Sequence, residues 1–236
     1  MSRACFVTGT DTAVGKTVVA ATIVAGLRAD GVSVAARKPV ITDVPERSVH
    51  DHGETADLSA LPDHELLGLV SGESPDVVSP VRFALPSSPH LAAEVAGTPI
   101  ALEPLVASLR ETAARSEATV VEGLGGLLVP FSDTWDVRRL ARELGWPVII
   151  VARCGLGTLN HTLLTLEAAR SAGLDVRAVV FTPWPAEPDI IEQSNRETIK
   201  RLGGIEVATL HQLAPLTRAS LAGAARTLPY ERWMAV

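Results

Sequence analysis

The sequence predicts an α/β fold in which helices cover both faces of a mostly parallel central sheet. Apolar runs of strand length alternate with segments of helix length, which is typical of repeated βαβ units. The expected strands are nearly continuous in Val, Ile and Ala, as in strands that are buried on both faces. Aromatic residues make up only 4% of the 236 residues, so aliphatic side chains must build the core. The length favours one domain that spans residues 1–236.

The individual elements follow from apolar runs and from glycines that end helices. Six runs are expected as strands, at residues 4–8, 33–36, 119–121, 148–152, 176–181 and 206–210. Helices are expected at residues 16–29, 158–172 and 187–202, because a glycine follows each where a left-handed cap is needed. Ser88 and Pro89 are typical of an N-cap and a first helical position, which predicts a fourth helix towards Gly97.

The pattern weakens between residues 42 and 89, so this segment is expected as a long excursion from the sheet. His50, His52 and His64 lie in it among polar residues, at a spacing that suits no common metal site, and we expect solvated loop histidines. The two cysteines, Cys5 and Cys154, have no neighbours at metal-ligand spacing. Buried, reduced thiols are therefore expected.

Charge and hydropathy argue against two classes of binding partner, nucleic acids and membranes. The formal net charge is −6 and the sequence pI is about 5.5, which argues against a protein that binds the phosphate backbone of nucleic acid. The longest stretch without a charged residue covers 13 residues, 154–166, which is too short to span a membrane. The N-terminal residues lack the pattern of a secretory signal, so we expect a cytoplasmic protein.

The strongest motif is GTDTAVGKT at residues 9–17, between the first expected strand and the first expected helix. In this context the motif predicts a phosphate-binding loop and a P-loop nucleoside triphosphatase type of fold. Backbone N–H groups and the helix N-terminus would hold phosphate oxygens, Lys16 would reach the β- and γ-phosphates, and the Thr17 hydroxyl would coordinate magnesium. Five residues rather than four separate Gly9 from Gly15, so Thr10 takes the usual place of the first glycine.

Three further residues are candidates for the same site. Glu122 ends an apolar strand and precedes glycines, at the edge of a doubly wound sheet where ligands gather, so it is placed to bind magnesium. A turn acid is the alternative. Lys38 follows the second expected strand and is either a site residue or a solvated loop lysine. Asp57 is either a magnesium ligand or a helix N-cap, and the residues alone favour the cap.

Together these motifs resemble the dethiobiotin synthetase family. The resemblance rests on GTDTAVGKT, KPV at residues 38–40, SPHLAA at 88–93, VEGLGG at 121–126 and LGTLNH at 156–161, and it runs from about Arg3 to Ala172. It implies an ATP- and magnesium-dependent cyclo-ligase of biotin synthesis, a homodimer, which joins carbon dioxide to 7,8-diaminopelargonate. These reactants and this chemistry come from the resemblance alone.

The resemblance also implies roles for individual residues. Lys38 matches a lysine that holds the substrate carbamate and the γ-phosphate, and with Lys16 and Thr12 it forms the expected catalytic set. Thr12, Lys38, Thr42, Glu122 and Asn160 match substrate-binding positions, with Asn160 contributed by the partner subunit. Thr17, Asp57 and Glu122 match the magnesium set. The implied nucleotide-binding residues are Ala13, Val14, Gly15, Lys16, Thr17, Val18, Asp57, Glu122, Gly123, Leu124, Gly125, Thr182 and Pro183.

Three departures from the family pattern bear on function. The family often has an adenine-reading Asn where this chain has FTPWP at residues 181–185, which predicts looser discrimination among nucleoside triphosphates. Ala13 replaces an acid, and Asp43 stands where a Gly often follows the Thr42 position. The segment at 210–213 lacks the expected proline-bearing base loop. A phosphate-loop ATPase that acts as a nucleotide-dependent dimer switch or partner-binding module, or a family member without catalysis, remains an alternative.

Overall fold

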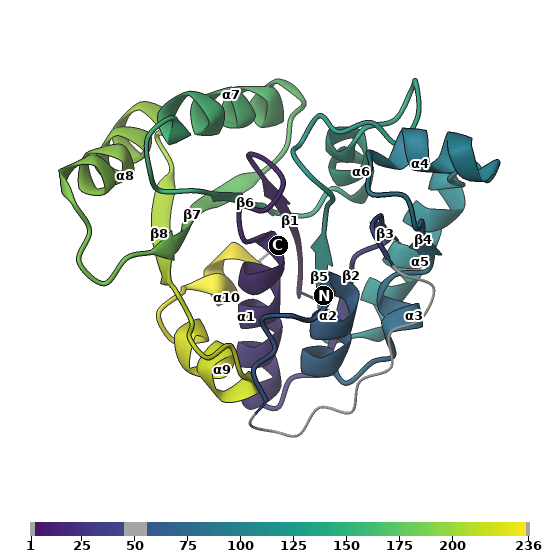
Figure 1. Cartoon of the computed structure of the whole chain (residues 1–236), viewed down its shortest axis with the longest axis horizontal. Coiled ribbons are helices and arrows are strands. Elements are labelled where there is room, and N and C mark those ends of the chain that lie inside the picture. The colour runs from purple at the N-terminus through teal and green to yellow at the C-terminus, as the bar shows by residue number, and fades with distance from the viewer. Residues whose placement is uncertain (1–2, 45–55, 235–236) are drawn as a thin grey trace.

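A computed structural model describes residues 3–44 and 56–234 and contains a central sheet of six parallel strands. The strand order is β2-β5-β1-β6-β7-β8, so β5 lies between β2 and β1 (Figure 1). The register pairs Arg37 with Val121 and Val7 with Glu122, which brings the carboxyl ends of β2, β5 and β1 to one edge. The strands are Arg3–Gly9 (β1), Val34–Arg37 (β2), Ala118–Glu122 (β5), Val148–Ala152 (β6), Val176–Trp184 (β7) and Glu206–His211 (β8).

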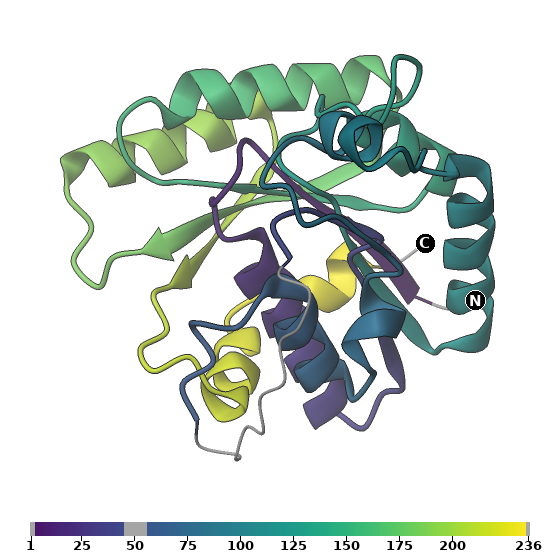
Figure 2. The ribbon, with the colours of Figure 1, turned by 45° about the vertical axis from the view of Figure 1, so that its right-hand side comes forward.

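Helices cover both faces of this sheet, as Figure 2 shows. On one face, α1, α2, α9 and α10 close one apolar core, in which Ile23 and Trp233 are fully buried. On the other face, α4 to α8 close a second core around Phe6, Leu140 and Phe181. The helices are Lys16–Ala29 (α1), Asp63–Ser71 (α2), Pro75–Val78 (α3), Pro89–Ala96 (α4), Leu102–Arg115 (α5), Val137–Leu144 (α6), Thr158–Ser171 (α7), Ile190–Gly203 (α8), Arg218–Ala225 (α9) and Tyr230–Trp233 (α10).

The structure confirms the fold class and all six expected strands, with ends that differ by a few residues. The helix at 158–172 ends one residue earlier than expected, at Ser171, and the helix expected from 187 begins at Ile190, because Asp189 caps it with a capping box. Ser88 is the N-cap residue of α4 and Gly97 ends that helix in the left-handed conformation, as predicted.

The excursion after β2 contains more regular structure than the sequence predicts. A small parallel pair, β3 (Val40–Ile41) and β4 (Val81–Arg82), lies beside the main sheet, and α2 and α3 occur between these two strands. His64 lies on α2 and is buried, so the expectation of a solvated loop histidine is wrong for this residue, because α2 packs against both α1 and α3. His50 and His52 lie outside the described residues.

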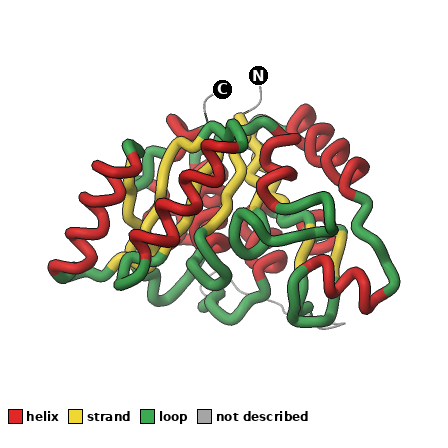
Figure 3. Tube along the Cα trace, turned by 90° about the horizontal axis from the view of Figure 1, so that it is seen from above, coloured by secondary structure: helices red, strands yellow, loops and turns green. Residues whose placement is uncertain are grey.

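Larger loops gather along one edge of the molecule, which Figure 3 shows from above. Both cysteines are free and buried, as expected, and burial raises the pKa of Cys5 to about 12. In the described part of the chain, no helix combines the length and the apolar character that crossing a bilayer requires.

Candidate active site

The loop between β1 and α1 has the geometry of a phosphate cradle. Ala13 and Gly15 both adopt left-handed conformations, with φ of 56° and 92°. A Cβ atom on Gly15 would lie 2.7 Å from Cγ2 of Thr182, so this position combines a strained backbone for other residues with a close neighbour. Lys16 begins α1, is buried, and donates from Nζ to the Asp11 carbonyl at 2.8 Å. Its ammonium is thereby directed over the loop, where a phosphate would lie.

Lys38 and Glu122 form a buried ion pair beside this cradle. They follow or end the neighbouring strands β2 and β5, and Lys38 Nζ lies 2.7 Å from Glu122 Oε1. Both side chains are almost completely buried, with 3% and 1% of their surface exposed. The backbone of Lys38 is fixed as well: its N–H donates to Val78 O, and its carbonyl accepts from Ser79 Oγ at 2.6 Å.

Two more groups complete this cluster. Thr17 Oγ1 donates to Glu122 Oε1 at 2.9 Å, and Asp63, the first residue of α2, makes a second ion pair with Lys38 Nζ. The cluster therefore contains two positive and two negative charges near the Thr17 hydroxyl, which belong to Lys16, Lys38, Glu122 and Asp63. The sequence did not single out Asp63, although an acid just after Pro62 is a typical first-turn residue of a helix.

Burial and charge act in opposite directions on these four groups. Burial acts to lower the pKa of Lys38, but the carboxylates of Glu122 and Asp63 outweigh it and raise that pKa, so Lys38 stays protonated. Burial lowers the pKa of Lys16. Burial raises the pKa of Glu122 despite the nearby lysines, whereas for Asp63 the attraction of Lys38 outweighs burial and lowers the pKa.

The other oxygen of Glu122 has no protein partner. Oε2 is buried and accepts no hydrogen bond, which is costly for a carboxylate unless something else binds there. It lies on the same side chain that accepts from Thr17. A magnesium ion would take one carboxylate oxygen and one hydroxyl and keep several water ligands, so the donor set fits this cation. No cluster of three or more His, Cys, Asp or Glu suited to a metal occurs among residues 3–44 and 56–234.

Asp57 does not join this group in the structure, unlike the expectation that it completes a magnesium set with Thr17 and Glu122. Its carboxylate is exposed, and Oδ1 accepts from Ser59 N at 3.0 Å and Leu216 N at 3.2 Å. These hydrogen bonds lower the pKa of Asp57. Asp57 therefore ties its own loop to the loop after β8, and the carboxylate beside Lys38 belongs to Asp63.

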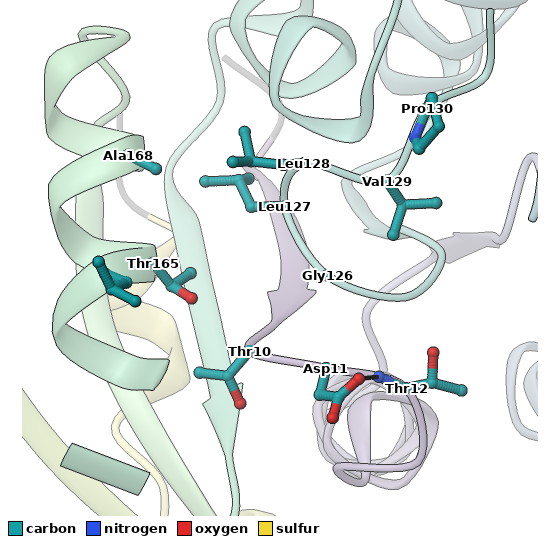
Figure 4. Close-up of a pocket in the computed structure, with 11 residues that line it drawn as sticks. Thr10, Asp11, Thr12, Gly126, Leu127, Leu128, Val129, Pro130, Thr165 and Ala168 are labelled. Atoms are coloured by element: carbon teal, nitrogen blue, oxygen red, sulfur yellow. Dashed lines mark hydrogen bonds between the residues drawn. The ribbon is translucent and has the colours of Figure 1, made fainter. Parts of the chain in front are cut away.

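A cavity of about 380 Å³ opens between the phosphate cradle, the loop after Glu122 and α7 (Figure 4). Residues 127–130 and α7 form cavity walls that are mainly apolar. The hydroxyl groups of Thr10, Thr12 and Thr165 are polar groups in the lining. Gly126 lies against this cradle, because a Cβ there would be 3.5 Å from Thr10 O. The cavity can hold a chain-like molecule with polar groups at one end.

The remaining predicted site residues divide into two groups. Thr182 is buried near the end of β7 and lies beside Gly15 of the cradle, whereas the carbonyl of the next residue, Pro183, accepts from Cys154 Sγ at 3.2 Å. Thr42 follows β3, is half-buried, and makes no hydrogen bond within the described residues, and Asn160 is exposed on the first turn of α7 and does not line the cavity.

Two of the departures from the family pattern have a structural counterpart. Asp43 has a φ of 63°, the left-handed conformation that favours Gly and that Asp tolerates better than most residues. The loop after β8 does carry a proline: Pro215, preceded by a cis peptide bond, lies two residues after the segment 210–213. Leu216 in this loop accepts from Leu58 N at 2.7 Å, so the loop is fixed beside Asp57.

Comparisons with known proteins agree with this geometry. A family profile described as an AAA domain matches residues 3–220. The chain is 42% identical to the ATP-dependent dethiobiotin synthetase of Anaeromyxobacter dehalogenans over 85% of each chain, and 38% identical to that of Anaeromyxobacter sp. strain Fw109-5 over 94% of this chain and 98% of that one. Among solved structures, the signal recognition particle receptor FtsY of Elizabethkingia anophelis matches with a TM-score of 0.50 at 12% identity, over 95% of this chain and 65% of that one, which supports the fold alone.

Proposed function

From the premise that this chain belongs to the dethiobiotin synthetase family, the ATP-dependent cyclo-ligases of biotin synthesis, we propose how its own residues perform the ring closure. The observation that carries the proposal is the buried Lys38–Glu122 pair beside the phosphate cradle. A lysine is rarely buried unless its charge is used or paired, and this one lies close enough to Lys16 of the cradle to act on its pKa.

The cradle binds the triphosphate of ATP. Backbone N–H groups of Ala13 to Val18 turn towards the phosphates, and Lys16 exchanges the Asp11 carbonyl for phosphate oxygens. Thr17 and Glu122 hold magnesium, which supplies charge neutralisation on the phosphates when bound. The free Oε2 atom of Glu122 supports this assignment. The loop from Glu122 through Gly123 and Leu124 to Gly125 lies against nucleotide and substrate.

The cavity accommodates the diamine substrate. Its apolar walls suit the alkyl chain of 7,8-diaminopelargonate, and the hydroxyl of Thr12 lies at the cradle end, where the amino groups must lie for reaction with the γ-phosphate. Thr42 lies four residues after Lys38 and directly follows β3, and its hydroxyl is the group that contacts the carbamate. These residues orient the substrate and exclude water.

The reaction then proceeds through a phosphorylated carbamate. One amine adds to carbon dioxide and loses a proton, and a carbamate oxygen attacks the γ-phosphorus so that ADP leaves. The second amine attacks the carbamate carbon and loses a proton, phosphate leaves, and the ureido ring closes. Lys38 and Lys16 offset the charge on the transferring phosphoryl group, and the raised pKa keeps Lys38 protonated for this role.

The base of the nucleotide lies near Thr182 and Pro183, next to Gly15. Neither side chain offers the paired amide donor and acceptor with which an Asn reads adenine. We therefore expect turnover with CTP and GTP as well as with ATP, and parallel assays with the three nucleotides test this.

The assembly and location follow the family expectation. We propose a cytoplasmic homodimer in which Asn160 of one protomer reaches the carboxylate tail of the substrate that is bound by the other. The exposed position of Asn160, outside the cavity of its own chain, and the 93% exposure of nearby Leu156 support this arrangement. Neither nucleic acid nor a membrane is an expected partner.

The decisive experiment measures phosphate release from ATP with and without 7,8-diaminopelargonate and bicarbonate, together with the mass of the product. We expect release that depends on both additions and a product with the mass of dethiobiotin. Release that is indifferent to the diamine would instead indicate an ATPase switch, and nucleotide binding without release would indicate a family member that lacks catalysis.

A further inference from the structure

Lys38 has two acidic partners that differ in how firmly the fold holds them. An ammonium group has three N–H donors, and Glu122 and Asp63 accept from two of them. Glu122 lies on a central strand with 1% of its side chain exposed. Asp63 begins α2, and 42% of its side chain is exposed. Asp63 is therefore the partner that solvent reaches and that a ligand can displace.

The charge balance of the cluster favours displacement of Asp63 when an anion binds. Lys16 and Lys38 balance Glu122 and Asp63 as long as the site holds no anion. The tail of a nucleoside triphosphate brings further negative charge to the same two lysines. A carboxylate in contact with Lys38 then competes with the terminal phosphate for one ammonium group, and the two negative charges repel each other at such a short distance.

The fold allows such an exchange at Asp63 but not at Glu122. Within the described residues, the Asp63 carboxylate pairs with Lys38 Nζ and accepts from no backbone N–H, while the nearby Thr17 hydroxyl donates to Glu122. Leu66 and Leu67 anchor the helix in the core one turn further on. A change of the Asp63 rotamer therefore frees Lys38 without unpacking α2.

We propose that Asp63 is the exchangeable partner of Lys38. It is a positioning residue that holds the ammonium group beside the cradle and gives up this place to the terminal phosphate of the bound nucleotide. This role rests on the proposed function only in that Lys38 meets the nucleotide. It concerns binding, so it can be measured without the diamine.

The test compares the binding of a non-hydrolysable ATP analogue with magnesium to the wild type, Asp63→Asn and Asp63→Ser by calorimetry. Asp76→Asn is the matched control, because Asp76 also pairs with an arginine, Arg82, but on the surface. Thermal melting checks that each variant is folded, and the serine variant serves if the asparagine variant is not. We expect both Asp63 variants to bind the analogue about five- to tenfold more tightly, in line with the loss of one partly exposed ion pair, and the control to match the wild type.

A double-mutant cycle separates exchange from simple repulsion. In the Lys38→Ala background there is no ammonium to share, so Asp63→Asn should no longer tighten binding. Equal or weaker binding by both Asp63 variants, or a gain that persists without Lys38, overturns the proposal. In steady-state assays, the Asp63 variants should show a lower KM for ATP and a kcat within threefold of the wild type. A lower kcat at constant KM also contradicts the proposal. Failure of the proposed function shows separately, as a wild type that binds the analogue but forms no dethiobiotin.

Discussion

Lys38→Ala removes the cation that pairs with Glu122 in the described part of the chain, and its effect on turnover tests the proposed mechanism directly. Loss of one preorganised stabiliser of a transition state typically lowers turnover by on the order of a hundredfold or more, about 2.7 kcal/mol or above. We expect this loss in kcat for dethiobiotin formation. The chain contains only three lysines, and the third, Lys200, is exposed on α8, so Lys200→Ala is a matched control that should retain wild-type turnover.

The same substitution has a second effect, on stability, that depends on pH. Removing one partner of a buried pair typically costs about 3–5 kcal/mol in the free energy of unfolding, because the other charge is left buried. Burial already raises the pKa of Glu122 above its usual value of 4.5, and loss of Lys38 removes the strongest influence that lowers it. A folded-state pKa above the unfolded one favours folding at low pH and loses this contribution as pH rises through the folded value.

The stability loss caused by Lys38→Ala should therefore be smaller at pH 5 than at pH 8. Urea unfolding followed by circular dichroism at both pH values, for this variant and the wild type, measures the difference. Turnover within a few-fold of the wild type would remove Lys38 from the mechanism. An equal stability loss at pH 5 and pH 8 would refute the assignment of Glu122 as the charge left behind.

Three further substitutions test the rest of the site. Gly15→Ala places a Cβ 2.7 Å from Thr182 Cγ2 at a φ of 92°, so ATP affinity measured by calorimetry should fall at least tenfold, and wild-type affinity would contradict the cradle geometry. Glu122→Gln removes a charged metal donor, so the magnesium concentration that gives half-maximal turnover should rise at least tenfold, and Mn²⁺ binding measured by electron paramagnetic resonance should weaken in parallel. Asn195→Ala removes the buried side-chain amide that donates to the carbonyls of Cys154 and Gly155 beside the site and should lower the free energy of unfolding by about 1–2 kcal/mol, measured by urea titration.

The sequence predicts the strands and many of the helix ends well, because short local patterns of residues determine them. Continuous apolar runs fix the six strands, and glycine after α1, α7 and α8 or proline at the start of α4 marks helix ends. Lys38 and Glu122 can be placed at one edge because the carboxyl ends of parallel strands meet there. Their direct pairing also depends on strand order, since β5 must insert between β2 and β1.

The sequence predicts the acidic partner of Lys38 less well, for a physical reason. Asp57 and Asp63 lie six residues apart in a segment of weak periodicity, and both have the surroundings of a helix-capping acid. Only tertiary packing separates them: α2 rests on α1 and carries Asp63 to Lys38, while the loop after β8 offers Asp57 a backbone N–H at Leu216. α6 also has a local signal in the sequence, an Asp136 N-cap and Gly145 after its last turn, from which this helix could be predicted.

The position of β5 between β2 and β1 has a consequence for the order in which the site residues are synthesised. The first 44 residues contain the whole phosphate loop and Lys38, but Glu122 arrives 84 positions after Lys38. A nascent chain released before this point lacks the acid that pairs with Lys38 and the strand that separates β2 from β1. The residues of the phosphate loop are therefore synthesised well before the acid that completes the cluster around Lys38.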